Sequence, residues 1–313
     1  MIQLMKRIQL IGKPLAVLLF LMSVRVGEAS NQPEPRPLGD LVDVGGYRVH
    51  IYCTGQGSPP VVVASGGFSF DWGLVQPKVA QYTGICTYDP SGTAWSDRVK
   101  PGDQVTCGDR VNELHRLLRG AGINGPYVMI GFSIGGLVAR LYATQYPSEI
   151  AGMVLVDHAF IDTGSDTGAA KPRRTWNDLD SPPVLISKTP LALDLQDDQN
   201  FTKLPKRDQE LHLWALSISD RPTPEMAARC FSEVASETKS SFPLGNKPLV
   251  VISTNYDSRR YAELQHKLLM LSHNSQQLIA ENSTHMVIID QPEVVVRAIG
   301  KVVEAVRNGK HAP

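Results

Sequence analysis

One serine in this sequence stands in a pattern that is typical of acyl-transfer chemistry. Gly131-Phe-Ser-Ile-Gly135 fits the motif G-x-S-x-G, in which a tight turn from a strand into a helix exposes the serine hydroxyl. The motif follows an apolar run at residues 127–130 and precedes a helical run, which is the context that it requires. We therefore predict that Ser133 is a nucleophile rather than part of an ordinary glycine-rich turn.

A serine hydroxyl is a weak nucleophile unless a base contacts it. His285 lies in Asn282-Ser-Thr-His-Met286, directly after the last predicted strand and before the final predicted helix. Of the other seven histidines, only His158 also stands at the end of a predicted strand. The chain order serine, acid, histidine and the loop position together predict His285 as the general base.

Two aspartates could orient the imidazole of such a base. Asp257 ends a predicted strand and short loop over residues 248–257, and Asp157 ends the preceding strand at residues 153–157. Both carboxylates would lie at the same edge of a parallel sheet, and either could hold the imidazole tautomer and stabilise the imidazolium. We favour Asp257 and keep Asp157 as the alternative acid.

A tetrahedral intermediate also requires backbone N–H donors. Ile134 follows the nucleophile at the start of a helix and can supply one of them. The loop at residues 65–68, Ser-Gly-Gly-Phe, follows an apolar strand and can supply the other. We predict an oxyanion hole formed by Ile134 together with Gly67 or Phe68.

These residues must be positioned by strands that alternate with helices. We expect a hairpin at residues 41–53, strands at 61–65, 85–88, 127–130, 153–156, 247–253 and 277–280, and helices at 109–118, 137–146, 261–271 and 294–307. Fully apolar strands that alternate with helices are typical of a mostly parallel sheet with both faces covered. The predicted fold class is therefore α/β.

Residues 160–242 interrupt this alternation, and we call this segment the cap. The cap is rich in Pro, Asp and Ser, and its weak periodicity indicates one helix, at Leu211, Trp214 and Ile218. We expect it to be an insertion over a core made of residues 40–159 and 243–308.

The N-terminus has the organisation of an export signal. Lys6, Arg7 and Lys13 precede an apolar run at residues 15–24, and Gly27 and Ala29 supply small residues for cleavage. An apolar run of about ten residues is too short for a spanning helix, which needs roughly 20. We expect a signal peptide at residues 1–29, cleaved after Ala29, then a linker at 30–39. An uncleaved membrane anchor or a core helix are the alternatives.

The amino-acid composition indicates which kinds of molecule this protein is expected to bind. The 313 residues contain 31 basic and 31 acidic side chains, so no global field attracts nucleic acid or an anionic membrane. The chain is 42% hydrophobic and 20% charged, which is typical of a globular protein with a substantial core. We expect a small-molecule substrate, no nucleic acid and no stable membrane span; composition leaves the oligomeric state open.

The four cysteines fit an exported protein better than a metal site. Cys53 ends one predicted strand and Cys86 lies in another, so an oxidising compartment would let them pair if those strands are neighbours. Cys107 and Cys230 could pair or remain free thiols. The sequence contains neither CxxC nor HxxxH, and we predict no metal and no cofactor.

Taken together, these motifs resemble the α/β-hydrolase superfamily over residues 40–308. Ser65-Gly-Gly67 looks like its oxyanion loop, the segment from Tyr88 to Asp97 looks like its Tyr-Asp-Arg-x-Gly-x-Gly-x-Ser segment, and the segment from Thr284 to Pro292 looks like its histidine loop. The resemblance implies that the second and fourth strands are neighbours, which favours a Cys53–Cys86 disulfide.

This sequence also departs from the family pattern. Pro90 and Ala94 replace the usual Arg and Gly, Phe132 replaces the common His of the elbow, and Ser65 replaces the His of the oxyanion loop. These changes affect the expected substrate more than the catalytic residues. A serine at the elbow is unlike the aspartate nucleophiles of the dehalogenases and epoxide hydrolases with this fold.

The resemblance implies a serine esterase that works through an acyl-enzyme. Phe160, Trp176 and Trp214 in the cap would line an apolar pocket, so we expect small, mainly uncharged carboxylic esters, although these aromatics could equally be core residues of the cap. Two alternatives remain, namely a lyase or other non-hydrolytic reaction on the same residues, and an inactive homologue that binds a ligand.

Overall fold

The computed structural model of the protein describes residues 34–98, 105–158, 200–220, 224–237, 243–254 and 259–309. The chain divides into two units, Met1–Arg36 and Pro37–Pro313, and the fold described below is that of the second unit. The predicted signal peptide lies outside the described residues, as do Phe160 and Trp176 of the cap.

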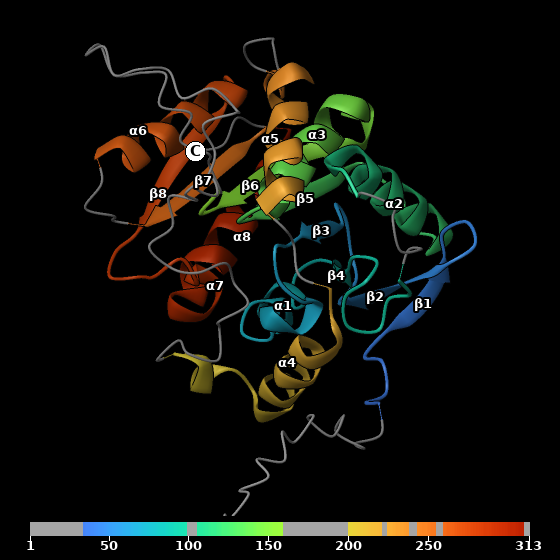
Figure 1. Ribbon diagram of the computed structural model, residues 1–313. Coiled ribbons are helices and arrows are strands. Elements are labelled where there is room, and N and C mark those ends of the chain that lie inside the picture. The colour runs from blue at the N-terminus through green and yellow to red at the C-terminus, as the bar shows by residue number, and fades with distance from the viewer. Residues whose placement is uncertain are drawn as a thin grey trace, which may run out of the picture. The chain divides into compact units, whose positions relative to one another are not determined.

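An eight-stranded sheet forms the centre of the second unit (Figure 1). Its order is β1-β2-β4-β3-β5-β6-β7-β8, where β1 pairs with β2 and β2 with β4 antiparallel, and the other neighbours are parallel. The mostly parallel α/β sheet that the sequence predicts is therefore confirmed. The strands are β1 Asp40–Asp43, β2 Arg48–Thr54, β3 Val61–Ala64, β4 Ile85–Asp89, β5 Tyr127–Phe132, β6 Ile150–Val156, β7 Leu249–Thr254 and β8 Ser275–Ala280.

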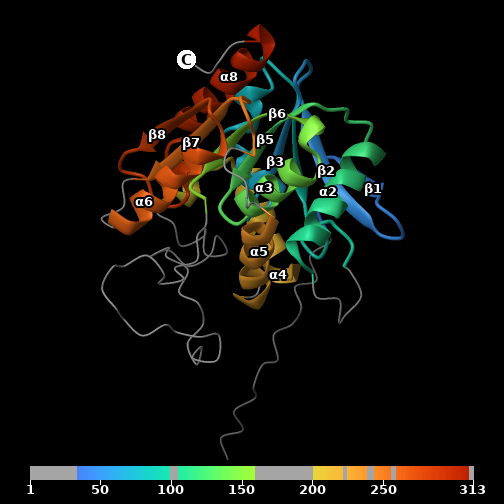
Figure 2. The same cartoon turned by 90° about the horizontal axis from the view of Figure 1, so that it is seen from above.

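Apolar side chains on the two faces of the sheet build two separate cores. Val62 and Ala64 of β3 face the core shared with α2 (Cys107–Gly120), α3 (Gly135–Gln145) and α5 (Pro224–Glu237). Val61 and Val63 face the core shared with α1 (Gln76–Val79), α7 (Val287–Asp290) and α8 (Pro292–Asn308). Figure 2 shows α3 and α8 on opposite sides of the sheet. Because successive strand side chains point to opposite faces, an all-apolar strand is buried on both.

Six further helical segments complete the described part of this unit. They are η1 Ser69–Trp72, η2 Pro147–Glu149, η5 Phe201–Lys203, α4 Lys206–Ile218, α6 Arg259–Lys267 and η6 Leu268–Leu271. The helix predicted within the cap is α4, and its Leu211 and Ala215 pack in a third cluster with Phe68, Phe70 and Trp95. A second helix within the cap, α5, was not predicted.

Two disulfides link segments that are distant in the chain. Cys53 of β2 stands opposite Cys86 of β4 in the antiparallel register, and the two are bonded. Cys107 of α2 is bonded to Cys230 of α5, so the second cysteine pair, which the sequence left open, is also joined. This bond attaches a cap helix covalently to the core.

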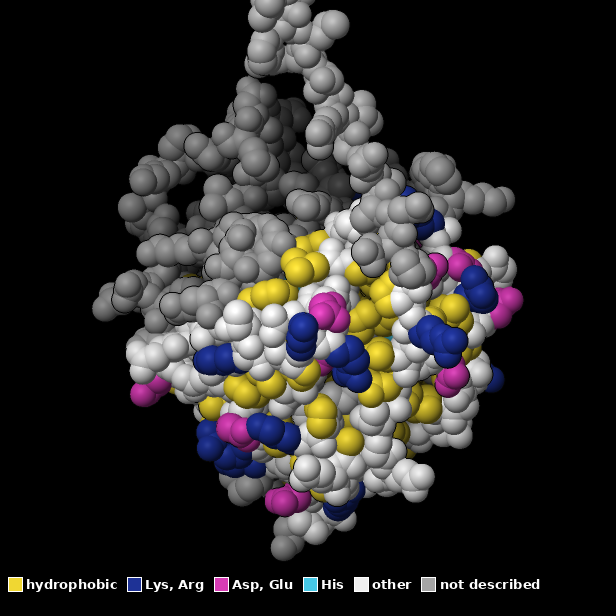
Figure 3. Space-filling model, turned by 90° about the horizontal axis from the view of Figure 1, so that it is seen from below, with side chains coloured by type: hydrophobic (Ala, Val, Ile, Leu, Met, Phe, Trp, Pro, Cys, Tyr) yellow, Lys and Arg dark blue, Asp and Glu magenta, His cyan; other side chains and the backbone are white. Residues whose placement is uncertain are grey.

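Charged and apolar side chains are mixed on the surface seen from below. On this face hydrophobic, basic and acidic side chains lie interspersed among one another (Figure 3). No helix within the described ranges has the length and apolarity needed to cross a membrane.

Candidate active site

Ser133 occupies the sharp turn between β5 and α3. Its φ of 55° is unusual for a residue with a side chain, and its N–H donates to Val156 O at 3.1 Å, which ties the turn to β6. A Cβ on Gly135 would lie 2.2 Å from Ala64 O, so only glycine allows the helix to approach β3 so closely. Ser133 is 6% exposed. The strand-turn-helix context required by the serine motif is present.

His285 lies between β8 and α7 and forms a short hydrogen bond with an aspartate. Its Nδ1 lies 2.6 Å from Asp157 Oδ2, and the histidine is 6% exposed. Its ring stacks on Phe132, the residue before the serine, with centroids 5.1 Å apart. His285 therefore lies beside the turn that carries Ser133. The described residues contain no hydrogen bond between Ser133 and His285, and such contacts are often long before substrate binds.

Asp157 is positioned by the end of β6 and by two hydroxyl donors. Its N–H donates to Ile252 O at 2.8 Å, and its φ of 40° ends the strand. The other carboxylate oxygen accepts from Tyr261 Oη at 2.6 Å and from Thr254 Oγ1 at 3.2 Å. Asp157 is fully buried. A buried carboxylate that accepts several hydrogen bonds is held in one orientation.

The acid that His285 contacts among the described residues is Asp157. Asp257 lies outside the described residues, whereas the alternative, Asp157, makes the hydrogen bond to His285 Nδ1. Because β6, β7 and β8 are parallel neighbours, both aspartates follow strands that end at the same edge. The sequence therefore placed both at that edge and could not tell which one turns toward the histidine.

His158, the other histidine at a strand end, has a different environment. It is fully buried, and a Cβ on Gly136 would lie 2.5 Å from its ring. Its Nε2 lies 3.4 Å from a guanidinium nitrogen of Arg140 on α3, and burial lowers the pKa of Arg140 to about 10. His158 thus packs against α3, while His285 pairs with the carboxylate.

The predicted oxyanion donors have different surroundings. The Ile134 N–H has no acceptor among the described residues. It is therefore available to donate a hydrogen bond to a ligand. In the loop at residues 65–68, which we call the oxyanion loop, Gly67 N–H donates to Ser65 Oγ at 3.1 Å and Phe68 N–H donates to Asp71 Oδ2 at 2.8 Å. Both predicted loop donors therefore already contact side-chain oxygens.

The oxyanion loop lies directly against Ser133. A Cβ on Gly66 would lie 3.5 Å from Ser133 Oγ and 3.1 Å from a side-chain carbon of Ile134. This glycine lets the loop backbone approach the serine hydroxyl. Substrate bound at Ser133 would therefore contact the loop.

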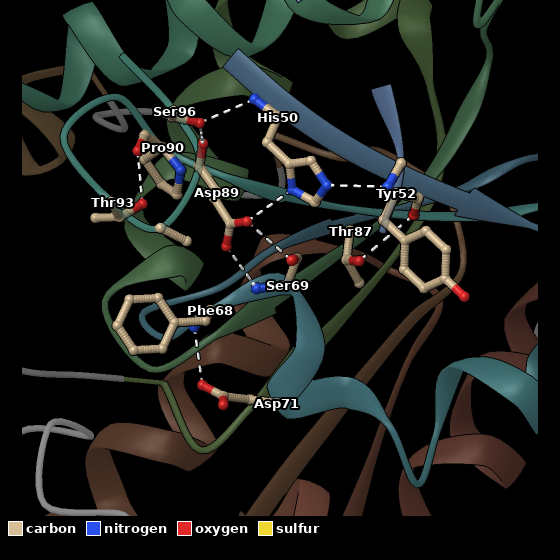
Figure 4. Close-up of polar contacts among 12 residues, drawn as sticks. His50, Tyr52, Phe68, Ser69, Asp71, Thr87, Asp89, Pro90, Thr93 and Ser96 are labelled. Carbon is tan, nitrogen blue, oxygen red and sulfur yellow. Dashed lines mark hydrogen bonds and ion pairs between the residues drawn. The ribbon is translucent and has the colours of Figure 1, made fainter. Parts of the chain in front are cut away.

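A buried histidine-aspartate pair anchors the segment that follows the loop (Figure 4). Asp89 of β4 accepts from Ser69 N at 2.7 Å and from Ser69 Oγ at 2.9 Å, and His50 Nδ1 lies 2.7 Å from the same carboxylate. His50 and Asp89 are both fully buried. Asp89 belongs to the Tyr-Asp segment noted in the sequence, and its role here is to fix η1.

The described residues contain no group of three or more His, Cys, Asp or Glu side chains arranged to hold a metal ion. Within these residues, His285 and Asp157 are hydrogen-bonded, and His285 stacks on Phe132, the neighbour of Ser133, so the three candidate residues stand after the ends of β5, β6 and β8. This arrangement can perform nucleophilic catalysis with general-base assistance.

Comparisons with known proteins agree with this fold. A family model described as alpha/beta hydrolase fold matches residues 59–292. A Schizosaccharomyces pombe protein of uncharacterized function is 23% identical over 279 residues, which are 85% of this chain and 50% of that protein. Monoacylglycerol lipase abhd6-B of Xenopus laevis is 31% identical over 130 residues, which are 39% of this chain and 38% of the lipase. The chain thus spans half or less of the length of these two relatives.

A thermophilic esterase of Thermogutta terrifontis has a similar fold. Its structure aligns with a TM-score of 0.59 at 20% identity, and the alignment covers 85% of this chain and 97% of the esterase.

Proposed function

The chain belongs to the α/β-hydrolase family, and from this premise we propose that it is a serine hydrolase that cleaves small, mainly uncharged carboxylic esters through an acyl-enzyme. The observation that carries the proposal is the 2.6 Å contact between His285 Nδ1 and Asp157, beside a serine with a φ of 55°. A nucleophile, a base and an orienting acid are the minimum set for this chemistry.

Each residue has one role in the proposed mechanism. The Asp157 carboxylate accepts a hydrogen bond from the Nδ1–H of His285, which leaves Nε2 as the basic nitrogen. His285 removes the proton from Ser133 as Oγ attacks the ester carbonyl, and then gives it to the leaving alcohol. Water attacks the acyl-enzyme in the same way and releases the acid. Tyr261 and Thr254 keep the carboxylate in place.

The negative charge of the tetrahedral intermediate requires two donors. In this proposal Ile134 N–H supplies one and the oxyanion loop supplies the other from Gly67. Ser65 Oγ, which accepts the Gly67 N–H in the structure, would give way to the substrate oxygen. Phe68 N–H remains on Asp71 and keeps the loop in shape.

Two observations support an uncharged substrate. Trp214 of α4 contacts Trp95 with ring centroids 5.1 Å apart, in the apolar cluster that also holds Phe68 of the oxyanion loop. The Xenopus relative is named a monoacylglycerol lipase, and the esters that it is named for are uncharged. An apolar wall beside the oxyanion loop favours burial of an acyl chain.

Trapping the intermediate tests this function directly. Purified protein is mixed with p-nitrophenyl butyrate, quenched in acid and digested, and the peptide that contains Ser133 is weighed by mass spectrometry. We expect a butyryl adduct in the wild type and none in Ser133→Ala. Ester turnover that is lost in Ser133→Ala but leaves no adduct in the wild type would favour a reaction without a stable acyl-enzyme. If the wild type does not turn over the ester, a ligand-binding homologue is favoured.

A further inference from the structure

A buried pair of side chains connects one helix of the cap to the oxyanion loop. We propose that His212 on α4 is a positioning residue that fixes the oxyanion loop through Asp71. This inference rests on the proposed function, because it concerns the donors that would stabilise the tetrahedral intermediate. It assigns a catalytic contribution to the cap beyond shaping a pocket.

Asp71 touches both loop residues that the sequence predicted as donors. Its Oδ2 accepts the Phe68 N–H at 2.8 Å, and the same oxygen would lie 2.5 Å from a Cβ on Gly67. The carboxylate therefore packs on the Gly67 backbone while it holds the next peptide group. A shift of Asp71 would move the peptide groups of both residues.

His212 determines where Asp71 lies. His212 Nδ1 lies 2.7 Å from Asp71 Oδ1, and the two side chains are 0% and 1% exposed. Because an ionised carboxylate can only accept, Nδ1 donates this hydrogen bond. The imidazole also packs against Phe68 and Phe201, with ring centroids 5.3 Å and 5.5 Å away. Its position is therefore fixed on both sides.

Two buried histidine-aspartate pairs hold the oxyanion loop and the η1 segment that follows it, one from the sheet and one from the cap. From the sheet, His50 and Asp89 hold Ser69, and both belong to core strands. From the cap, His212 and Asp71 hold Phe68. The first pair is present whenever the core is folded, whereas the second forms only when α4 is docked on η1. Docking of α4 and the geometry of the oxyanion loop are therefore coupled.

The coupling has a defined chemical consequence. Without His212, the buried Asp71 carboxylate would lose its hydrogen-bond donor. This carboxylate lies beside the loop that would bind the oxyanion of the tetrahedral intermediate. An unpaired buried charge is costly and moves toward water or other donors, which displaces the loop. Misplacement of catalytic groups by about 1 Å lowers rates by roughly a hundredfold. The effect should fall on kcat, since the donors act in the transition state.

Three substitutions at His212 and one control separate positioning from simple packing. His212→Asn retains a donor near the Nδ1 position, His212→Gln moves the donor toward the Nε2 position, and His212→Leu removes it. The control is Gln209→Ala, since the Gln209 side chain bonds Thr202 O at 3.2 Å and Leu204 O at 2.7 Å and does not touch the loop. Each variant is checked for folding by circular dichroism.

The readouts are kcat and KM on p-nitrophenyl acetate and the rate of labelling by a small fluorophosphonate. We expect His212→Leu and His212→Gln to lower kcat and the labelling rate roughly tenfold to a hundredfold with KM almost unchanged. His212→Asn should recover most of the loss, and Gln209→Ala should keep the wild-type kcat. If His212→Leu fails to fold, the contrast between Asn and Gln carries the test.

Equal kcat in folded Asn, Gln and wild-type proteins would overturn the inference. A matching loss of kcat in Gln209→Ala would also overturn it, because cap packing alone would then explain the effect. Failure of the proposed function looks different, since the wild type itself would then show neither ester turnover nor labelling of Ser133.

Discussion

At the scale of single residues, the site depends on two backbone conformations that are rare outside glycine. Ser133 and Asp157 have φ values of 55° and 40°, and both follow directly from buried parallel strands. Each is held by a backbone hydrogen bond to the neighbouring strand, from Ser133 N–H to Val156 O and from Asp157 N–H to Ile252 O. The sheet thus supports two strained residues at the ends of neighbouring strands.

The identity of the acid gives the first prediction. Asp157→Asn should lower kcat on p-nitrophenyl acetate by about 10³- to 10⁴-fold, because the amide cannot hold the catalytic tautomer of His285. Asp257→Asn is the matched variant and should stay within roughly threefold of the wild type. The opposite ranking of the two variants would return the acid role to Asp257.

A second prediction concerns the donor to that acid. Tyr261→Phe removes the 2.6 Å hydrogen bond to Asp157 with little change of shape, so kcat should fall roughly threefold to tenfold. The control is Tyr142→Phe on α3, which removes a hydroxyl that donates to Glu149 at the same distance of 2.6 Å. Steady-state kinetics should show the loss for Tyr261→Phe alone. Equal losses in both variants would indicate general destabilisation.

A candidate nucleophile and a candidate base could be proposed from the sequence because a local pattern accompanies each of them. Ser133 stands in a motif with its strand and helix, and His285 stands in the last loop. The acid could not be fixed, since the conformation that turns Asp157 toward the histidine leaves no pattern in the sequence. Tyr261 and His212 were missed for a related reason, because they reach the site from helices distant in the chain.

At the scale of elements, apolar runs located the sheet well. The strands expected at 61–65, 85–88 and 127–130 correspond to β3, β4 and β5, and the final helix expected at 294–307 corresponds to α8. The cap was harder to predict. The helix α5 is held by the disulfide to Cys107 and by contacts with the core, and such tertiary contacts leave weak periodicity in the sequence.

The buried acid of α4 gives a third prediction. Asp208 is fully buried, and this burial raises its pKa, while the hydrogen bond from Arg207 opposes the rise. One of its carboxylate oxygens has no partner among the described residues. Because the pKa is raised in the folded state, protonation of Asp208 stabilises the folded protein at low pH. This stabilisation is lost as the pH rises through the pKa that Asp208 has in the folded protein.

Asp208→Asn should therefore raise the free energy of unfolding at pH 7.5 by roughly 1 kcal/mol, because the buried charge is removed. The gain should shrink as the pH falls toward the ordinary carboxyl pKa of 3.8. Urea unfolding at several pH values measures it. A gain that is independent of pH would show that the charge of Asp208 is not the cause.

At the scale of the whole molecule, two features bear on where the protein works. Both cysteine pairs form disulfides, which persist in oxidising compartments. The sequence places a signal-like segment ahead of the folded unit. We propose that the protein is exported and cleaved after Ala29.

This proposal gives a fourth prediction. When the full chain is expressed in a bacterial host, the periplasmic or secreted fraction should contain a protein whose first residue is Ser30. Edman sequencing of that fraction identifies the N-terminus. Recovery of the intact N-terminus in the membrane fraction would favour an uncleaved anchor instead.

The most direct test of the central claim is labelling with a fluorophosphonate, which reacts with a serine only when a base activates it. Wild-type protein should be labelled at Ser133, and Ser133→Ala should not be labelled. His285→Ala should be labelled at least about a hundredfold more slowly, because the general base is lost. An unlabelled wild type that is folded, or labelling that survives in Ser133→Ala, would contradict the assignment of this chain as a serine hydrolase.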